Sequence, residues 1–294
     1  MILVTGATGT VGRALLPMLL ERDEDVRVLV RDPRGLGRLR VEVRITLGDL
    51  AEMSDPRVVR QALRGVDTVI HLAAAIRDQP PVRIEELNGL ATARLLRAAE
   101  QVGVGRFVFF SAIGATEFQR TRFFRAKALA ERAVMGSELD TTVFAPSIVY
   151  DGDDPWVTIQ RRLSLLPAIL VSGDGQAEFE PMWAGDVGRC VLADLERGEG
   201  SRRHELAGPQ RLTYDQMARL IARVWGRDRP LVHVPLAFIH YGLAGLRRLV
   251  GEAAFATWEE AELMEVPMVS ARGDADVRAL GVEPRPMEQV LAGA

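Results

Sequence analysis

MILVTGATGTVGRALLPMLLERDEDVRVLVRD (residues 1–32) is the stretch that decides the fold of this chain. Its first four residues are apolar and predict a buried strand. Leucines then recur at helical spacing over residues 15–20, and the run VRVLV at 26–30 predicts a second strand. Strand, glycine-containing turn, helix and strand in this order indicate a βαβ unit.

The turn of this unit carries Gly6, Gly9 and Gly12. In a dinucleotide-binding βαβ unit, the first glycine allows a sharp turn and the second lets the backbone approach a pyrophosphate. The third lets helix and strand pack closely, and the helix N-terminus points N–H groups at the phosphates. A purely structural turn is the alternative interpretation. Because the glycines lie between a strand and a helix, we predict a dinucleotide site, which Thr8, Thr10 and Val11 complete.

The composition sets the class of protein. The chain has 294 residues, 48% of them apolar and 26% charged, which is typical of a globular protein with one large or two modest domains. A net charge of -3 gives no electrostatic case for nucleic acid as a partner. The single cysteine, Cys190, predicts a packed residue and a reducing compartment. We find no export signal and no apolar run long enough to span a bilayer, so we expect a cytoplasmic protein, and no metal site.

Arginines at the end of the second predicted strand bear on the choice between NAD and NADP. A carboxylate at this place accepts hydrogen bonds from the ribose hydroxyls of NAD, whereas arginine binds the 2′-phosphate of NADP. Arg31 directly follows the strand and Arg34 is close behind, while Asp32 precedes a proline and is as well suited to forming a turn. The sequence therefore favours NADP, with NAD as the alternative.

Four further strands are predicted at residues 43–47, 67–72, 106–110 and 141–145, with helical segments between them. This alternation predicts an α/β fold with a doubly wound parallel sheet, whose ligand lies at the carboxyl ends of the strands. The predicted cofactor-binding residues sit at such ends, and beyond the first turn they are Arg31, Arg34, Asp49, Leu50, Ala73, Ala74, Pro146 and Ile148. His71, near the end of one strand, is expected to be a packed residue.

The character of the sequence changes after Tyr150. We predict a dinucleotide-binding domain over residues 1–150 and a smaller substrate or partner domain over 151–294, with segments near 181–206 returning to the core. An apolar loop is expected around residues 167–170. The apolar segment 235–250 (PLAFIHYGLAGLRRLV) favours a buried helix, with a helix on a membrane surface or a protein partner as the alternative.

Several motifs together resemble the atypical extended group of the short-chain dehydrogenase/reductase family. They are TGATGTVG, LVRDP, GDL, HLAA, FFRAK, PSIVY and HELAGP, and they cover roughly residues 1–225. The subgroup that includes the 39 kDa accessory subunit of respiratory complex I is the most similar, and NmrA-like proteins are neighbours. The resemblance implies a Rossmann fold and an NAD(P) cofactor, commonly NADPH. It also implies that Asp49 binds the adenine amino group and that Asn88 lines the core beside the cofactor.

The resemblance also predicts where the chemistry departs from the usual pattern. In the family, a tyrosine moves the proton and a lysine four residues later lowers the tyrosine pKa and holds the nicotinamide ribose. Lys127, the one lysine among 37 basic residues, matches this lysine, but Phe123 stands where the tyrosine is expected. Ser111 resembles the serine that ends the fifth strand, and Tyr150 is a candidate replacement donor as well as a structural tyrosine. Lys127, Ser111 and Tyr150 are therefore the candidate catalytic residues.

Three functions follow from these observations. The first is an NADP-preferring oxidoreductase that acts on a small apolar carbonyl, enone or quinone-like substrate with an atypical catalytic site. The second is a non-catalytic NADPH-binding module for sensing or assembly. The third is a nucleotide-sugar epimerase or dehydratase, which the absence of the tyrosine disfavours.

Overall fold

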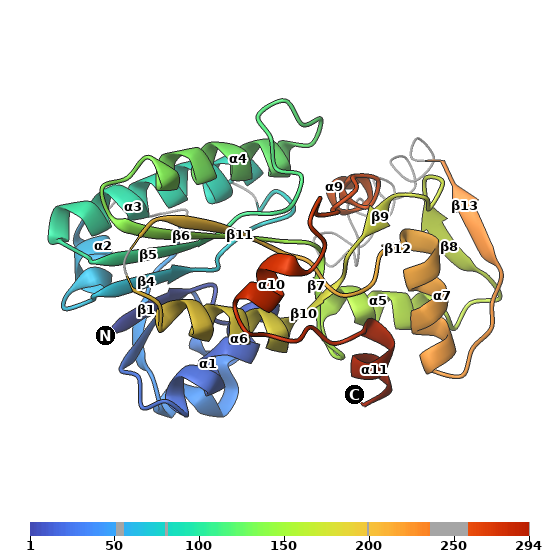
Figure 1. Ribbon diagram of the computed structural model, residues 1–294, viewed down its shortest axis with the longest axis horizontal. Coiled ribbons are helices and arrows are strands. Elements are labelled where there is room, and N and C mark those ends of the chain that lie inside the picture. Colours follow the sequence, from blue (N-terminus) through green and yellow to red (C-terminus); the bar gives the residue numbers. More distant parts are fainter. Residues whose placement is uncertain (51–55, 80–81, 199, 236–257, 294) are drawn as a thin grey trace.

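The structure is a computed structural model that describes residues 1–50, 56–79, 82–198, 200–235 and 258–293. Its centre is a seven-stranded sheet with the order β11-β6-β5-β4-β1-β2-β3 (Figure 1). Every neighbouring pair of strands in it is parallel. The strands are β1 (Ile2–Thr5), β2 (Val26–Val30), β3 (Arg44–Leu47), β4 (Thr68–His71), β5 (Arg106–Phe110), β6 (Asp140–Pro146) and β11 (Arg202–Leu206). The predicted doubly wound α/β fold is confirmed.

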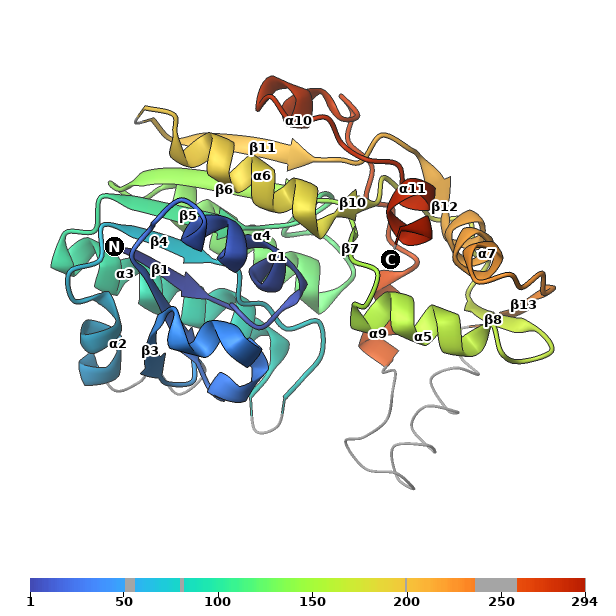
Figure 2. The same ribbon diagram turned by 90° about the horizontal axis from the view of Figure 1, so that it is seen from below.

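Helices cover both faces of this sheet, as Figures 1 and 2 show. One face carries α1 (Thr10–Leu20) and α6 (Ala184–Leu195), which pack against each other. The other carries α2 (Pro56–Leu63), α3 (Ala91–Val102) and α4 (Arg122–Met135). A 3₁₀ segment, Pro33–Val41, follows β2, and a π-helical turn, Glu86–Leu90, precedes α3.

The pattern of β1 explains why it lies at the centre of the sheet. All four of its residues are buried, with Ile2 and Val4 in the core on the α1 side and Leu3 in the core on the opposite side. A parallel strand that is covered on both faces reads as a continuous apolar run, as the first residues of the chain do. Fully burying each such aliphatic side chain stabilises the fold by about 1.5–3 kcal/mol.

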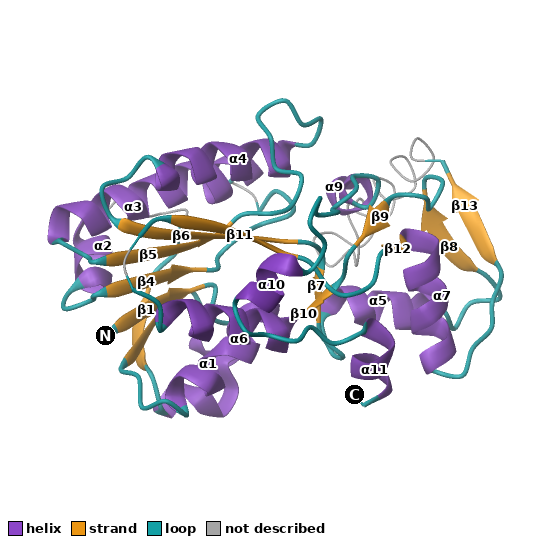
Figure 3. Ribbon diagram, in the orientation of Figure 1, coloured by secondary structure: helices purple, strands orange, loops and turns teal. Residues whose placement is uncertain are grey.

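Most of the remaining elements form a second body beside the carboxyl ends of the strands, whereas the helix Ala275–Ala279 packs against β11 of the central sheet (Figure 3). Short strand pairs join β7 to β10, β8 to β13 and β9 to β12. Residues 167–170, expected to be a loop, include the start of β8, and this prediction is wrong because Ile169 and Val171 pair with β13 and are buried. The elements are β7 (Val149–Tyr150), α5 (Pro155–Leu163), β8 (Ile169–Ser172), β9 (Glu178–Phe179), β10 (Met182–Trp183), β12 (Leu212–Thr213), α7 (Tyr214–Val224), β13 (Leu231–Val234), α9 (Trp258–Leu263), α10 (Ala275–Ala279) and α11 (Met287–Ala292).

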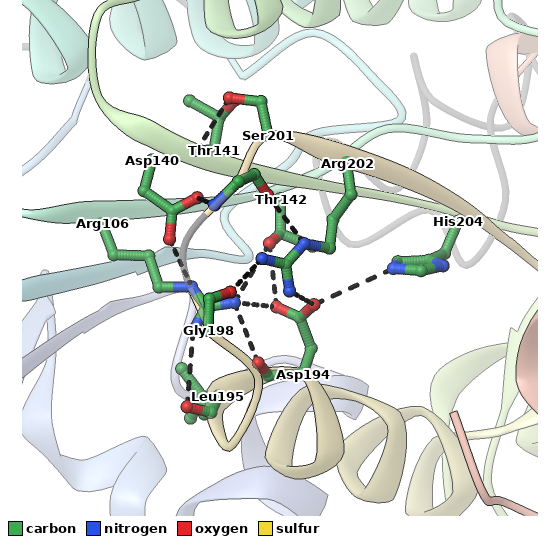
Figure 4. A network of polar contacts seen from close by, with 11 residues as sticks. Arg106, Asp140, Thr141, Thr142, Asp194, Leu195, Gly198, Ser201, Arg202 and His204 are labelled. Carbon is green, nitrogen blue, oxygen red and sulfur yellow. Dashed lines mark hydrogen bonds and ion pairs between the residues drawn. The ribbon is translucent and has the colours of Figure 1, made fainter. Parts of the chain in front are cut away.

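A network of charges holds β11 at the edge of the central sheet (Figure 4). The fully buried Asp194, near the end of α6, accepts hydrogen bonds from Arg106 Nη2 at 2.7 Å and from Thr142 Oγ1 at 2.8 Å. Arg202, the first residue of β11, reaches the same carboxylate at 3.4 Å. The network therefore ties β5, β6, α6 and β11 together at the amino ends of the strands.

Among the described residues, no helix has the length and apolar character needed to cross a membrane. The apolar segment at 235–250 falls, apart from Pro235, outside the described residues, so the structure does not test the two interpretations of it.

Candidate cofactor and catalytic site

The glycine turn after β1 has the shape that a dinucleotide needs. Gly6 has a φ of +73°, and a Cβ there would lie 2.6 Å from the backbone nitrogen of Ala73. A Cβ at Gly12 would lie 2.5 Å from the Gly6 carbonyl oxygen. The start of α1 can therefore pack this closely against the turn only because residue 12 is glycine. At Gly9, in contrast, a Cβ would meet only the Gly6 oxygen, at 3.3 Å, among the described atoms.

The amino end of α1 is open. Its N-cap is Gly9, and no side chain makes a capping hydrogen bond there. The first N–H groups of a helix have no partner within the helix and attract anions. A turn in which a side chain at Gly9 would crowd the Gly6 carbonyl oxygen, followed by an uncapped helix end, fits the phosphates of a dinucleotide.

The turn also lies where the sheet topology predicts a ligand. The strand order reverses between β1 and β4, and a ligand of a doubly wound sheet binds at the carboxyl ends of such strands. Ala73 follows β4 and contacts Gly6 across this point, and the neighbouring Ala74 is exposed. Asn88 fixes the same loop, because its side chain bonds both the N–H and the carbonyl of Ala75, at 3.1 and 2.7 Å. Asn88 is thus buried behind the predicted cofactor-binding loop.

His71 is a packed residue, as expected. It is fully buried, with Nδ1 2.7 Å from Thr5 Oγ1 and Nε2 2.8 Å from Thr92 Oγ1. Burial, with a smaller contribution from the charge of Lys127, lowers the His71 pKa to about 3. Cys190 is likewise a buried helix residue, and burial raises its pKa to about 12.

The residues expected to contact the adenosine end lie close together. Arg31 donates from Nη1 to Gln79 Oε1 at 2.7 Å and lies 3.8 Å from Asp49 Oδ2. Asp32 caps the segment after β2, because its carboxylate accepts a hydrogen bond from the Arg34 N–H at 2.9 Å. The turn-forming interpretation of Asp32 is therefore confirmed, and the Arg34 side chain is exposed.

Lys127 is buried inside the site region. It lies on α4, is 2% exposed, and donates from Nζ to the Phe110 carbonyl at 2.6 Å. Its Nζ also lies 4.9 Å from the ring centre of Phe109 and 5.9 Å from that of Phe123. Burial lowers the Lys127 pKa to about 7. The amine can therefore change its protonation state near neutral pH.

Phe123 lies one helical turn before Lys127 on α4. It is partly buried in an apolar cluster with Ala112, Ile113 and Tyr150, and its ring meets that of Phe124 edge to face at 5.4 Å. A phenyl ring keeps this packing but has no proton to give. The position where the resemblance places a tyrosine therefore supplies shape and no acid.

Two of the predicted catalytic residues are buried without a hydrogen-bond partner for their hydroxyls. Ser111 Oγ and Tyr150 Oη make no hydrogen bond to any described residue, and both side chains are almost fully buried. Ser111 directly follows Phe110, whose carbonyl accepts the Lys127 hydrogen bond. The Ser111 N–H donates to the Phe144 carbonyl at 2.7 Å. Burial, and to a lesser degree the charge of Asp151, raises the Tyr150 pKa, so that hydroxyl stays protonated.

Thr121 is a further polar residue of the site region, and the sequence alone does not point to it. It is the N-cap of α4 but makes no capping hydrogen bond, and its buried Oγ1 has no partner among the described residues. A threonine before a helix predicts a cap, so no pattern in the sequence indicates a free hydroxyl. Pro146, predicted to follow the strand, is the last residue of β6 because it pairs with Leu206 of β11, and Ile148 lies two residues beyond it. The Ile113 N–H donates to the Pro146 carbonyl at 2.9 Å.

Comparisons with known proteins agree with this geometry. A family model described as NAD(P)H-binding matches residues 6–165. Subunit 9 of the NADH dehydrogenase 1 alpha subcomplex from Arabidopsis thaliana is 29% identical over 238 residues, which are 76% of this chain and 58% of that protein. Sterol demethylase protein B from Methylococcus capsulatus is 30% identical over 268 residues, or 79% of this chain and 77% of that one.

Among solved structures, the UDP-glucose 4-epimerase of Thermus thermophilus in complex with NAD is similar in fold. It has a TM-score of 0.74 at 20% identity, and the match covers 99% of this chain and 96% of the epimerase. At this identity the likeness shows the fold alone. The family model and the sequence relatives show more: the chain belongs to the NAD(P)H-binding Rossmann family, in the extended short-chain dehydrogenase/reductase group.

Proposed function

We propose that this protein is an NADP-preferring oxidoreductase that reduces a small apolar carbonyl, enone or quinone-like compound. The observation that carries the proposal is Lys127, a buried amine that makes one hydrogen bond to the residue preceding Ser111, whose own hydroxyl has no partner among the described residues. Buried polar groups are nearly always paired in native proteins. Unused hydrogen-bonding groups at the carboxyl end of β5 support binding of a ligand there.

The residues present fit a dinucleotide. Gly6, Gly9, Gly12 and the first N–H groups of α1, at Thr10 and Val11, would hold the pyrophosphate, with Thr8 beside them. Ala73 and Ala74 would leave room for the sugar, and Lys127 would bind the nicotinamide ribose. The remaining contacts would come from Asp49, Leu50, Pro146 and Ile148. When bound, the nicotinamide supplies or accepts a hydride.

Arginines near the end of β2 support a preference for NADP. The Asp32 carboxylate is engaged by the Arg34 N–H, so it is less available to ribose hydroxyls. The guanidinium groups of Arg31 and Arg34 are 62% and 89% exposed at the same place. Arginine is suited to binding phosphate through two parallel hydrogen bonds, in a bidentate geometry.

Replacing both arginines tests this preference. We expect Arg31→Ala/Arg34→Ala to weaken NADPH binding by about 10–100-fold, because a charge-assisted hydrogen bond contributes about 1.5–3 kcal/mol, and to leave NADH binding nearly unchanged. Titration calorimetry with both cofactors measures the two affinities. Equal losses for NADPH and NADH would contradict the proposal, and Arg38→Ala on the same segment is the matched control.

An apolar substrate fits the side chains beside the site. Phe123, Ile148 and Trp156 are partly buried and pack against the apolar cluster that contains Tyr150. The relative from Methylococcus capsulatus is named for a sterol, which is also apolar. The usual proton donor is missing, and general acid–base catalysis typically contributes about 10²–10⁴-fold in rate. Substrates whose reduction needs little acid assistance, such as enones and quinones, suit this site best.

Turnover with a panel of quinones, enones and aldehydes tests the proposed activity. We expect NADPH oxidation with at least one conjugated substrate. The loss of NADPH absorbance measures the rate. Phe123→Tyr should raise the rate with simple aldehydes by up to about 10²-fold, because it restores a phenol one helical turn from Lys127. Phe124→Tyr, on the next residue of the same helix, is the matched control.

A non-catalytic NADPH-binding module is the second candidate, and Phe123 is the observation that favours it. The Arabidopsis relative is named as a subunit of a larger complex. The match to this chain covers 58% of the length of that subunit. Tight NADPH binding without turnover of any panel member would contradict the oxidoreductase and support the module. The epimerase-like structures share the fold alone and give no support to a nucleotide-sugar substrate.

A further inference from the structure

The end of the molecule farthest from the central sheet exposes a group of aliphatic side chains. Leu165 is 62% exposed, and Leu166, Leu170 and Val232 are 44–47% exposed. Leu170 and Val232 are register partners in the parallel pair β8–β13, so both lie on the same face of it. The opposite face carries the buried Ile169 and Val171. Figure 1 shows β8 and β13 at the far side of the second body from β1–β6.

Four arginines lie in the chain segments that carry these side chains or in the turn before β13. Arg161 lies with its guanidinium carbon 5.6 Å from the ring centre of Trp225, and Arg227 Nη1 donates to Ser164 Oγ at 3.2 Å, next to Leu165. Arg162 and Arg229 are exposed nearby in the sequence. None of these four arginines forms an ion pair with a described residue. Asp228 is the one acidic residue in the segments 161–172 and 225–235.

We name this surface the basic tip, defined by Leu165, Leu166, Leu170 and Val232 together with Arg161, Arg162, Arg227 and Arg229. The segments 161–172 and 225–235 carry four arginines and one aspartate, while Glu288 lies near Trp225, Asp215 contacts His233, and the whole chain carries a net charge of -3. Exposed aliphatic groups that cluster on a protein surface indicate contact with a partner. Arginines that form no ion pair with the described residues favour a negatively charged partner.

We propose that the basic tip docks on the surface of a lipid bilayer that contains anionic lipids. Aliphatic side chains can enter the boundary between headgroups and acyl chains while the arginines remain at the level of the lipid phosphates. A second copy of this chain is a poorer partner, because a symmetric contact through the same surface would place arginine against arginine. The site at the carboxyl ends of the strands lies away from this surface (Figure 1), and the proposal does not depend on its activity.

Vesicle sedimentation tests the proposal. We expect the full chain to bind vesicles that contain phosphatidylglycerol at least about tenfold more tightly than pure phosphatidylcholine, with binding that weakens as salt is raised. Leu165→Glu/Leu170→Glu should reduce binding by about tenfold or more. Val41→Glu/Leu47→Glu is the matched control, because Val41 and Leu47 are 81% and 62% exposed and both lie outside the tip. Arg161→Glu/Arg162→Glu is compared in the same way with Arg94→Glu/Arg97→Glu on α3.

Thermal unfolding of each variant establishes that it is folded before it is tested. Absence of binding to the anionic vesicles would overturn the proposal, as would equal binding to both kinds of vesicle. Equal effects of the tip variants and their controls would also overturn it. Self-association that Leu165→Glu abolishes, measured by light scattering without lipid, would instead assign the surface to a second copy of the chain.

Discussion

The two ends of the central sheet differ in how many hydrogen-bond and ion-pair partners their buried polar groups have. At the amino ends of the strands, Asp194 gathers Arg106, Thr142 and Arg202 into one network (Figure 4). Arg106 Nε and His204 Nε2 make no hydrogen bond to the described residues there, but each lies within 4 Å of a carboxylate, at 3.6 and 3.8 Å. The charges at this end of the sheet are therefore matched by groups of the chain itself.

At the carboxyl ends, His71 is paired with Thr5 and Thr92, but the buried polar groups around the end of β5 are left with fewer partners. Lys127 makes one hydrogen bond, although an ammonium group can donate three. The hydroxyls of Ser111, Thr121 and Tyr150 make none with the described residues. Unpaired buried polar groups cost stability, and native proteins keep them where a function requires them. The difference teaches that one end of the sheet is built for stability and the other for a ligand.

Removing the centre of the network should have the largest effect on stability. We expect Asp194→Ala to lower the free energy of unfolding by about 3–5 kcal/mol, because it leaves Arg106 and Arg202 partly buried without their carboxylate. Urea unfolding measures the loss, and NADPH affinity of the folded protein should not change. Asp153→Ala, at a side chain that is 85% exposed, is the control and should change stability by less than about 0.5 kcal/mol. A loss below about 1 kcal/mol for Asp194→Ala would remove the contrast between the two ends.

Lys127→Met should have the opposite effect. Burial lowers the Lys127 pKa to about 7, so the folded state loses this proton at a pH where the unfolded lysine still holds it. The unfolded state thus binds more protons between about pH 7 and pH 10, and stability rises with pH in that range. Below about pH 7 both states are protonated, and the full cost of a buried charge is present. We expect the methionine variant to be more stable by about 1–3 kcal/mol near pH 6 and to lack the rise.

The same variant should bind NADPH about 10–100-fold more weakly, since it loses a charge-assisted hydrogen bond to the cofactor. Urea unfolding at several pH values and calorimetric titration measure the two effects. A higher free energy of unfolding together with weaker NADPH binding would show that Lys127 serves the ligand and not the stability of the fold. A variant that is less stable yet binds NADPH normally would assign Lys127 to the structure alone.

Local features explain how much of the fold the sequence predicts. The bounds of β2 and β5 coincide with the predicted runs at 26–30 and 106–110, because apolar residues there are flanked by charged residues and turns. The sequence does not predict β8, because its strand character depends on pairing with β13, far along the chain. The glycine turn could be predicted because each of its steric requirements lies within a few residues or at the next strand end.

Features that depend on distant residues could not be predicted in this way. The Arg106–Asp194 pair joins residues 88 positions apart, and no spacing rule connects them. The sequence also does not predict the free hydroxyl of Thr121. Whether a described group lies within hydrogen-bond distance of it depends on the three-dimensional packing. Lys127 was visible only because it is the one lysine of the chain and lies four residues after Phe123. Its buried hydrogen bond to Phe110 required the three-dimensional packing of α4 on β5.

A matched pair of threonines gives the smallest and most direct test of the contrast. Thr142 and Thr121 are both buried, but Thr142 Oγ1 donates to Asp194 at 2.8 Å, whereas Thr121 Oγ1 has no partner among the described residues. Valine replaces the hydroxyl by a methyl group of similar size and keeps the β-branch. We expect Thr142→Val to lower the free energy of unfolding by about 1–2 kcal/mol.

Thr121→Val should leave the free energy of unfolding unchanged or raise it by up to about 1 kcal/mol, because it removes an unsatisfied polar group from the interior. Urea midpoints at constant slope measure both changes. NADPH affinity distinguishes what the Thr121 hydroxyl is for: a decrease with Thr121→Val and none with Thr142→Val would assign it to the ligand. If both valines cost the same stability, the Thr121 hydroxyl is satisfied within the protein, and the carboxyl end of the sheet is paired as fully as the amino end.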